Sequence, residues 1–216
     1  MTKLYLIRHA QAEGNRQGTV QGKIETDITD LGRAQLSALR RRFAAIPVDA
    51  VYSSDLFRAV ETARAISEPK KLPIKTDRAF REVDFGRWEG RAWAELAITD
   101  TQQVENFNAH LERFQAPGGE TAQMLLERFV PKMQEIVQEN EGKTVALVSH
   151  GLALRLVLGA LNGLTPGQIQ TLHGANTAVS LVEWEGLHPS VIFQDDASHL
   201  GPVESNPIHG KEWWNT

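Results

Sequence analysis

Two histidines follow apolar segments that are typical of buried strands. His9 comes after the run at 3–7, and His150 comes directly after the run at 144–149. Because ligands of open α/β sheets bind beyond the carboxyl ends of the strands, both imidazoles are predicted to lie at the same rim. An imidazole has a reference pKa of about 6.5, so its neutral form is available as a nucleophile near neutral pH.

Two arginines accompany these histidines. Arg8 immediately precedes His9, and Arg58 lies near the start of a predicted helix that follows a third apolar run, at 49–53. A guanidinium group offers forked N–H donors that match phosphate oxygens, and a helix N-terminus adds positive potential. One such residue alone is more often structural, but two histidines and two arginines at three strand ends together indicate an anion-binding catalytic site.

The elements that would carry these side chains alternate between strands and helices. In chain order, we predict a strand at 3–7, a loop at 14–30, a helix at 31–45, a strand at 49–53, a helix capped by Ser54 and Asp55 that reaches about 68, a strand at 72–76, a helix at 121–140, a strand at 144–149, a helix at 151–161, and a hairpin of strands at 178–184 and 190–194. Pro69 is expected to end the second helix, and Pro131 to kink or split the third. The alternation predicts an α/β fold in three layers, with a mostly parallel central sheet and helices on both faces.

The composition indicates one globular domain. The chain has 216 residues, of which 41% are hydrophobic and 23% are charged, and no long linker divides it, so a single domain over 1–216 is predicted. The formal net charge of −4 lacks the clustered basic excess of a nucleic-acid-binding protein. Cysteine is absent from the sequence, which excludes disulfides, thiolate zinc sites and a cysteine nucleophile.

The apolar segments do not predict a membrane protein. The longest, at 145–164, is interrupted by His150 and Arg155, so it lacks the continuous apolar length of a span. The first seven residues are too short for the core of a signal peptide and run directly into Arg8. We therefore expect a cytoplasmic protein.

Four segments carry a resemblance to a known family. They are LYLIRHAQAEGN at 4–15, VYSSDLFRAVETA at 51–63, FREVDFGRWEG at 80–90 and VALVSHG at 145–151. In order and spacing they resemble the histidine phosphatase superfamily, the phosphoglycerate mutase-like group, whose usual signature is Arg-His-Gly, then an acidic residue, a hydroxyl residue and Asn. The resemblance covers nearly the whole chain and favours the phosphatase branch of that superfamily.

The resemblance implies a role for each residue of the site. His9 would be the nucleophile that accepts the phosphoryl group. Glu82, which stands just before the Gly-x-Trp-Glu-Gly segment, would protonate the departing alkoxide and then take a proton from water. Arg8, Arg58 and His150 would hold the phosphoryl oxygens and stabilise the charge that they carry.

Further residues are expected to bind the substrate. They are Asn15, Gln21, Gly22 and Gly151. The implied partner is a small-molecule phosphate ester, with neither nucleic acid nor membrane involved, and the sequence leaves the natural substrate and the oligomeric state open. No metal ion or cofactor is expected, because the arginines would supply the positive charge that Mg²⁺ supplies in other phosphoryl-transfer enzymes.

The first signature departs from the family pattern at three positions. Ala10 replaces the usual glycine, Gln11 the usual acidic residue, and Ala12 the usual serine or threonine. The methyl group of Ala10 should be tolerated if its backbone angles are ordinary. The loss of the hydroxyl at Ala12 removes one donor, which affects the identity of the substrate more than the reaction.

Three functions fit the resemblance. The first is a phosphomonoesterase, and the second is a phosphoglycerate mutase-type isomerase, which must hold a small polyanion and so needs additional cations. The stretch at 91–116, expected to lie over the site, offers only Arg91 and Arg113, which favours the phosphatase. The third is a catalytically weak regulatory module of the same fold, and the presence of both His9 and Glu82 argues against it.

The stretch at 91–116 is expected to be a cap inserted into the domain, one that sets the preference for the leaving group. Its aromatic residues Trp93, Phe107 and Phe114 are spaced too irregularly for one buried helix face. The alternative is a surface helix pair whose aromatic side packs on the sheet.

Overall fold

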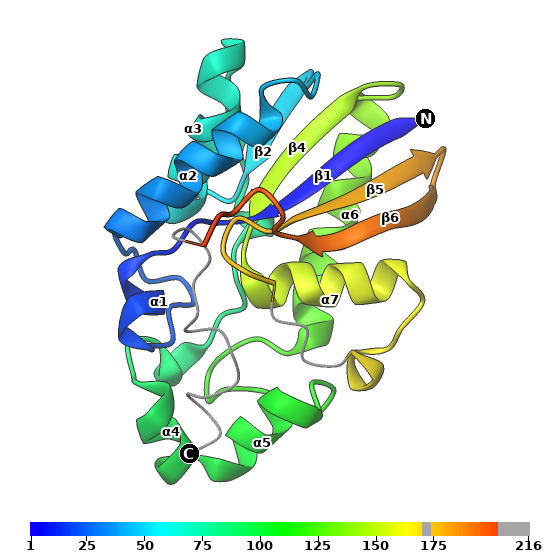
Figure 1. The fold of residues 1–216 in the computed structure, drawn as a ribbon. Coiled ribbons are helices and arrows are strands. Elements are labelled where there is room, and N and C mark those ends of the chain that lie inside the picture. The colour runs from blue at the N-terminus through cyan, green and yellow to red at the C-terminus, as the bar shows by residue number, and fades with distance from the viewer. Residues whose placement is uncertain (170–173, 203–216) are drawn as a thin grey trace.

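A six-stranded sheet forms the centre of the computed structural model, which describes residues 1–169 and 174–202 (Figure 1). The strands are β1 (Thr2–Arg8), β2 (Ala50–Ser53), β3 (Ile74–Thr76), β4 (Thr144–Ser149), β5 (Val179–Glu185) and β6 (His188–Asp196). They lie in the order β3-β2-β4-β1-β5-β6. The pairings from β3 to β1 are parallel, whereas the pairings of β1 with β5 and of β5 with β6 are antiparallel. The predicted α/β fold with a mostly parallel sheet is confirmed.

Helices cover both faces of this sheet. They are α1 (Glu13–Gln17), α2 (Asp30–Phe43), α3 (Phe57–Lys70), α4 (Trp93–Thr99), α5 (Thr101–Ala109), α6 (Ala122–Glu139) and α7 (Gly151–Leu161), with short 3₁₀ turns at Arg78–Phe80, Gly86–Trp88 and Pro166–Gln168. In Figure 1, α2 and α3 lie on one side of the strands, and α6 and α7 lie on the other. This gives the three layers that the alternating pattern predicts.

The two faces of the sheet enclose separate parts of the core. Ile7 and Val148 point toward α2 and α3 and pack with their apolar side chains. Leu6 and Leu147, one position earlier in each strand, point the other way and pack with α6 and α7. Successive side chains of a strand alternate between its faces, so a continuous apolar run is required where both faces are covered.

The register of the parallel strands aligns their carboxyl ends. Arg8 at the end of β1 lies opposite Ser149 at the end of β4, and Ser53 at the end of β2 lies opposite Val148. The residues that follow these strands therefore meet at one rim of the sheet, as the sequence predicts.

The structure corrects two expectations about prolines, namely that Pro69 ends its helix and that Pro131 splits its helix. Helix α3 continues through Pro69 to Lys70 and ends where Lys71 takes a left-handed φ of 54°. Helix α6 runs unbroken through Pro131, because side chains such as Phe129 and Met133, on either side of the proline, are fully buried and hold the helix on the core. A short helix, α1, lies within the stretch predicted to be a loop.

The predicted cap of α3 is also wrong. The helix begins after Leu56, which makes no side-chain capping hydrogen bond. Ser54 lies 2.8 Å from the imidazole of His150, and Asp55 accepts two hydrogen bonds from Arg81. Both side chains thus interact across the rim, and the Ser54 hydroxyl also accepts a hydrogen bond from the backbone N–H of Leu56 at 3.3 Å.

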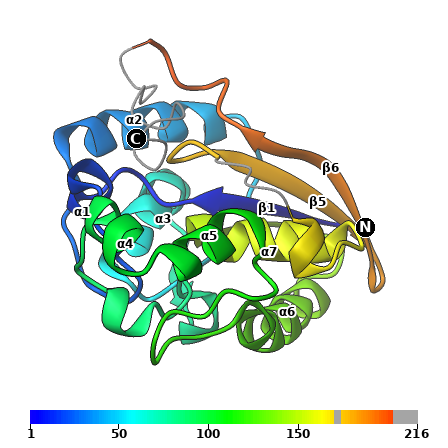
Figure 2. The ribbon, with the colours of Figure 1, turned by 90° about the horizontal axis from the view of Figure 1, so that it is seen from below.

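Helices α4 and α5 lie beyond the carboxyl ends of the strands, next to the rim (Figures 1 and 2). Within the described residues, none of the helices combines the length and the apolar character needed to cross a membrane.

Candidate active site

His9 is buried directly after β1, with only 3% of its surface exposed. Its Nδ1 atom lies 2.7 Å from the carbonyl oxygen of Ala10. A carbonyl can only accept a hydrogen bond, so Nδ1 carries the proton and Nε2 keeps the lone pair. The backbone is fixed on both sides, because His9 N donates to Ser149 and the amide of Asn176 donates to the His9 carbonyl. The ring is therefore held in one orientation, as the predicted role of a nucleophile requires.

His150 lies beside it, with the two ring centres 5.2 Å apart. Burial, reinforced by the positive charge of Arg58, lowers the pKa of His150 well below its ordinary value, so the ring is neutral. Its Nε2 atom lies 2.8 Å from the Ser54 hydroxyl, while its buried Nδ1 has no hydrogen-bond partner within the described chain. If the hydroxyl donates to Nε2, the Nδ1 proton is available to an oxygen of a ligand.

Arg8 packs its guanidinium group against the first residue of α7. A Cβ atom on Gly151 would lie 3.1 Å from Arg8 Nε, so a larger residue would crowd this group. One end of the guanidinium donates to the carbonyl of Gly174. The buried Nε atom has no partner among the residues that the structure describes, which leaves one N–H of Arg8 for a ligand.

Arg58 is almost fully buried and is anchored by its far end. Its two terminal nitrogens donate to the carbonyls of Ile24 and Gly22 at 2.8 and 2.7 Å, whereas its buried Nε is unpaired in the described structure. Burial lowers the pKa of Arg58 to about 10, which leaves it charged at neutral pH. Gly22 contributes this carbonyl from a left-handed φ of 49°, where an added Cβ would lie 2.1 Å from Glu89.

The loop around α1 brings two amide side chains to the site. Asn15 accepts a hydrogen bond from the backbone of Ala12 at 3.1 Å, which orients the side chain and leaves the amide nitrogen as its donor. Gln21 accepts from the Thr26 hydroxyl at 2.7 Å. Both residues line the same cavity.

Glu82 is placed against the N-terminus of α7. Its carboxylate oxygens accept from the backbone N–H groups of Leu152 and Ala153 at 3.1 and 2.9 Å. These groups have no acceptor within the helix, so the side chain caps the helix that follows His150. The sequence does not reveal this capping role, and it couples Glu82 to the same helix end that holds Arg8.

The loop that carries Glu82 is held by an arginine that the sequence analysis missed. Arg128 of α6 donates to the carbonyls of Ala79, Arg81 and Glu82 at 2.7, 3.0 and 2.9 Å. Its other donors bind both carboxylate oxygens of Glu120 at 2.8 Å. The arginine lies 46 residues along the chain from Glu82, and nothing in its local sequence marks this contact.

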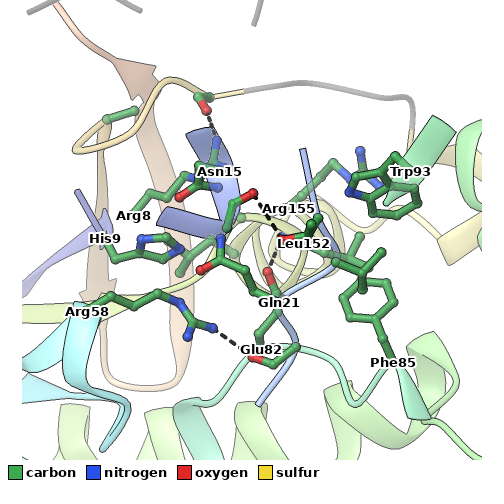
Figure 3. A pocket seen from close by; sticks show the side chains of 18 of the residues that line it. Arg8, His9, Asn15, Gln21, Arg58, Glu82, Phe85, Trp93, Leu152 and Arg155 are labelled. Atoms are coloured by element: carbon green, nitrogen blue, oxygen red, sulfur yellow. Dashed lines mark hydrogen bonds between the residues drawn. The ribbon is translucent and has the colours of Figure 1, made fainter. Parts of the chain in front are cut away.

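A single cavity collects the predicted residues. Those that line it are Arg8, His9, Asn15, Gln21, Gly22, Arg58, Glu82 and Gly151. His150 is fully buried and is not among these lining residues, although its ring centre lies 5.2 Å from that of His9. Figure 3 shows Arg8, His9 and Arg58 on one side of the cavity and Phe85 and Trp93 on the other. The cavity therefore has a cationic end at the strands and an aromatic end beside α4.

The aromatic residues of the expected cap belong to one cluster of rings but differ in whether they line the cavity. Trp93 and Phe107 line the cavity, with their ring centres 4.6 Å apart. Phe114 is only 2% exposed and packs against Phe85 and Trp88 in the core. Phe114 is buried although the spacing of the three residues fits no single helix face, because the rings come from several segments and form one cluster.

The three departures from the family signature lie outside the cavity wall. The φ angle of Ala10 is not positive, so the methyl group is tolerated there. Gln11 accepts a hydrogen bond from the Thr29 hydroxyl at 2.7 Å in a buried position. Ala12 contributes the backbone N–H that orients Asn15. Within the described residues, no group of three or more His, Asp or Glu side chains is arranged to hold a metal ion.

Comparison with known proteins agrees with this geometry. The model of the histidine phosphatase superfamily (branch 1) matches residues 4–196. Phosphoserine phosphatase 1 of Hydrogenobacter thermophilus is 27% identical over 93% of this chain and 95% of its own length. The metal-independent phosphoserine phosphatase of Arabidopsis thaliana is 29% identical over 94% of this chain and 85% of its own. The solved structure of Bacillus stearothermophilus YhfR is 28% identical, covers 92% of this chain and 99% of its own, and superposes with a TM-score of 0.88.

Proposed function

The chain belongs to the histidine phosphatase superfamily, and on that premise we propose that it hydrolyses phosphate monoesters of small metabolites through a covalent phosphohistidine on His9. The observation that carries this proposal is a set of buried N–H donors without partners in the described chain. They include Nε of Arg8, Nε of Arg58 and Nδ1 of His150. Leaving such a group unpaired costs about 1–3 kcal/mol, more when it is charged, and the oxygens of a phosphoryl group would satisfy all three.

In the first step, Nε2 of His9 attacks the phosphorus atom. The N–P bond forms as the bond between phosphorus and the ester oxygen breaks. Glu82 gives its proton to the departing oxygen, so the leaving group departs as an alcohol. Arg8, Arg58 and neutral His150 stabilise the charge on the equatorial oxygens.

In the second step, a water molecule attacks the phosphorus atom of the phosphohistidine. Glu82 accepts the proton of this water, the N–P bond breaks, and inorganic phosphate leaves with His9 restored. Two easier displacements replace one difficult hydrolysis. In this proposal arginine side chains supply the positive charge, so no metal ion takes part.

The isomerase remains the second candidate because the structure adds one cation to the cavity, Arg155. The two cations of the expected cap do not serve that purpose. Arg91 is 2.6 Å from Glu95, and Arg113 is 3.4 Å from Glu112; neither lines the cavity. Phosphate release into water distinguishes the hydrolase from an isomerase, which returns the phosphate to its substrate.

Hydrolysis of an aryl phosphate before and after exhaustive treatment with chelator tests the proposed function. We expect release of inorganic phosphate with each turnover and the same rate after chelation. Strict dependence on Mg²⁺ or Zn²⁺ would contradict the role given to the arginines. Transfer between phosphoglycerates without net release of phosphate would favour the isomerase.

A further inference from the structure

Arg155 is a half-buried cation to which the proposed reaction assigns no task. It lies on α7, one helical turn after Gly151, and its side chain lines the cavity. Its Nε and Nη2 atoms are buried and make no hydrogen bond in the described structure. Most buried polar atoms in proteins do have a partner, so two unpaired donors on one guanidinium facing a cavity indicate a ligand.

The surroundings of Arg155 hold the guanidinium without neutralising it. The ring of Phe107 lies 5.6 Å from the guanidinium carbon, at the distance of a cation–π contact. Arg155 forms no ion pair with any described carboxylate. Burial lowers the pKa of Arg155 to about 10, so the side chain stays charged at neutral pH. Glu82 and Asp195 lie near enough to act on this charge, but neither is paired with it, which leaves the guanidinium available to a ligand.

Asp195 is a second charged residue on the cavity wall. It takes a left-handed φ of 53°, and strained angles of this kind are often found at functional sites. Its backbone N–H donates to the Ser180 hydroxyl at 3.0 Å. Asp195 lies close enough to Arg8 and Arg155 to interact with both charges, yet it forms no ion pair with either within the described residues.

The helix sets the spacing between the two cationic parts of the cavity. The Arg8 guanidinium lies against Gly151, the first residue of α7. A rise of about 1.5 Å per residue puts the backbone of Arg155 about 6 Å farther along α7. Because Arg155 lines the same cavity, it can meet a second anionic group of a short substrate whose phosphoryl group lies at the cationic end beside Arg8, which we call the phosphate end.

We propose that Arg155 and Asp195 form a recognition subsite for a phosphorylated α-amino acid, with the carboxylate on Arg155 and the ammonium group on Asp195. This inference rests on the proposed function, because it needs the phosphoryl group held beside His9. The planar guanidinium matches a carboxylate through two parallel N–H bonds. The Asp195 carboxylate attracts an ammonium group and repels a purely anionic substrate, which discriminates against phosphoglycerates.

Four substrates separate the two halves of the subsite. O-phosphoserine carries both groups, 3-phosphoglycerate carries only the carboxylate, phosphoethanolamine carries only the ammonium group, and an aryl phosphate carries neither. We expect the wild-type enzyme to show its highest kcat/KM among the three alkyl esters on O-phosphoserine. The aryl phosphate reports the phosphoryl chemistry alone.

The variants Arg155→Gln and Asp195→Asn then test each half. Arg155→Gln should lower kcat/KM for phosphoserine and 3-phosphoglycerate at least about tenfold more than for phosphoethanolamine. Asp195→Asn should lower kcat/KM for phosphoserine and phosphoethanolamine at least about tenfold more than for 3-phosphoglycerate. Asparagine tolerates the left-handed backbone, so the second variant keeps the conformation, and Arg155→Lys retains the charge if Arg155→Gln folds poorly.

Several outcomes would overturn this inference. Wild-type activity on the aryl phosphate with no preference for phosphoserine over the two partial analogues refutes the subsite and leaves the proposed function standing. Equal losses on all four substrates in both variants show that these residues serve the fold or the phosphoryl step instead. Absence of any hydrolysis by the wild-type enzyme refutes the proposed function itself.

Discussion

The two ends of the cavity are held in place by different interactions. At the phosphate end, backbone hydrogen bonds fix the residues beyond the strands, such as His9 N to Ser149 at 3.0 Å and Ser54 N to Val148 at 2.9 Å. At the aromatic end, the rings of Trp93 and Phe107, which belong to two short helices, contact each other. Hydrogen bonds are directional, whereas dispersion contacts tolerate small displacements. We infer that the first end serves the common reaction and the second serves selectivity.

The largest expected effect lies at the phosphate end. Replacing His9 with alanine removes the covalent route, so turnover should fall by roughly 10³-fold or more on every substrate. The measurement is steady-state turnover, with the melting temperature as a check that the fold is retained. A variant with near-normal turnover would contradict the mechanism at both ends of the cavity.

The next effect depends on the leaving group. Glu82→Gln removes the proton that the alkoxide needs, so alkyl phosphates should lose about 10²-fold or more in kcat/KM, and aryl phosphates much less. The glutamine oxygen can still accept from α7, which limits the structural loss. Glu82→Ala is the matched control, because it should also cost about 0.5–2 kcal/mol of stability through the lost cap. An equal loss of kcat/KM on both ester types would show that Glu82 only caps the N-terminus of α7.

Two phenylalanines test whether the aromatic end of the cavity determines selectivity. Phe107→Ala changes the cavity wall and should shift relative rates among alkyl esters by up to about tenfold. Phe114→Ala, away from the wall, should lower the free energy of unfolding by about 3–5 kcal/mol with little change in those relative rates. The reverse pattern would show that the cavity wall is not where selectivity resides. Chemical denaturation and a panel of phosphate esters provide the two measurements.

The smallest effect is a pH dependence of stability. Because the pKa of His150 in the folded protein lies well below its ordinary value, the unfolded chain binds a proton first as the pH falls. Stability should therefore decline from about pH 6.5 downward. His150→Gln should reduce the slope of melting temperature against pH, whereas the exposed His188, replaced in the same way, should not. A residual slope is expected from His199, whose pKa burial lowers to about 4.

A slope that is unchanged in His150→Gln would show that another group accounts for the acid sensitivity. It would also remove the argument that His150 is a neutral donor at the phosphate end.

The sequence predicts the phosphate end better than the supports around it. Apolar runs in the sequence indicate where strands end, and the residues directly after parallel strands lie at one rim of the sheet. Ser54 and Arg128 act across the fold, on His150 and on the loop of Glu82, so no local pattern marks them. Arg155 is visible in the sequence only as a charge within an apolar stretch. Its unpaired donors become evident when the cavity is known.

Pro131 is a case in which a local sequence rule predicts a break that the structure does not contain. The covalent geometry of proline predicts that Pro131 kinks or splits its helix, but helix α6 continues through this residue without a split. The apolar face of the helix is buried on the core, and that packing outweighs the local preference.

The account depends above all on a covalent bond between phosphorus and His9. Rapid quenching during turnover of a labelled phosphate ester, followed by peptide mapping, tests it most directly. We predict an acid-labile, base-stable phosphoenzyme with the label on the peptide that contains His9, and no label on the His9→Ala variant. Turnover without any labelled protein, or label on a different residue, would contradict the mechanism.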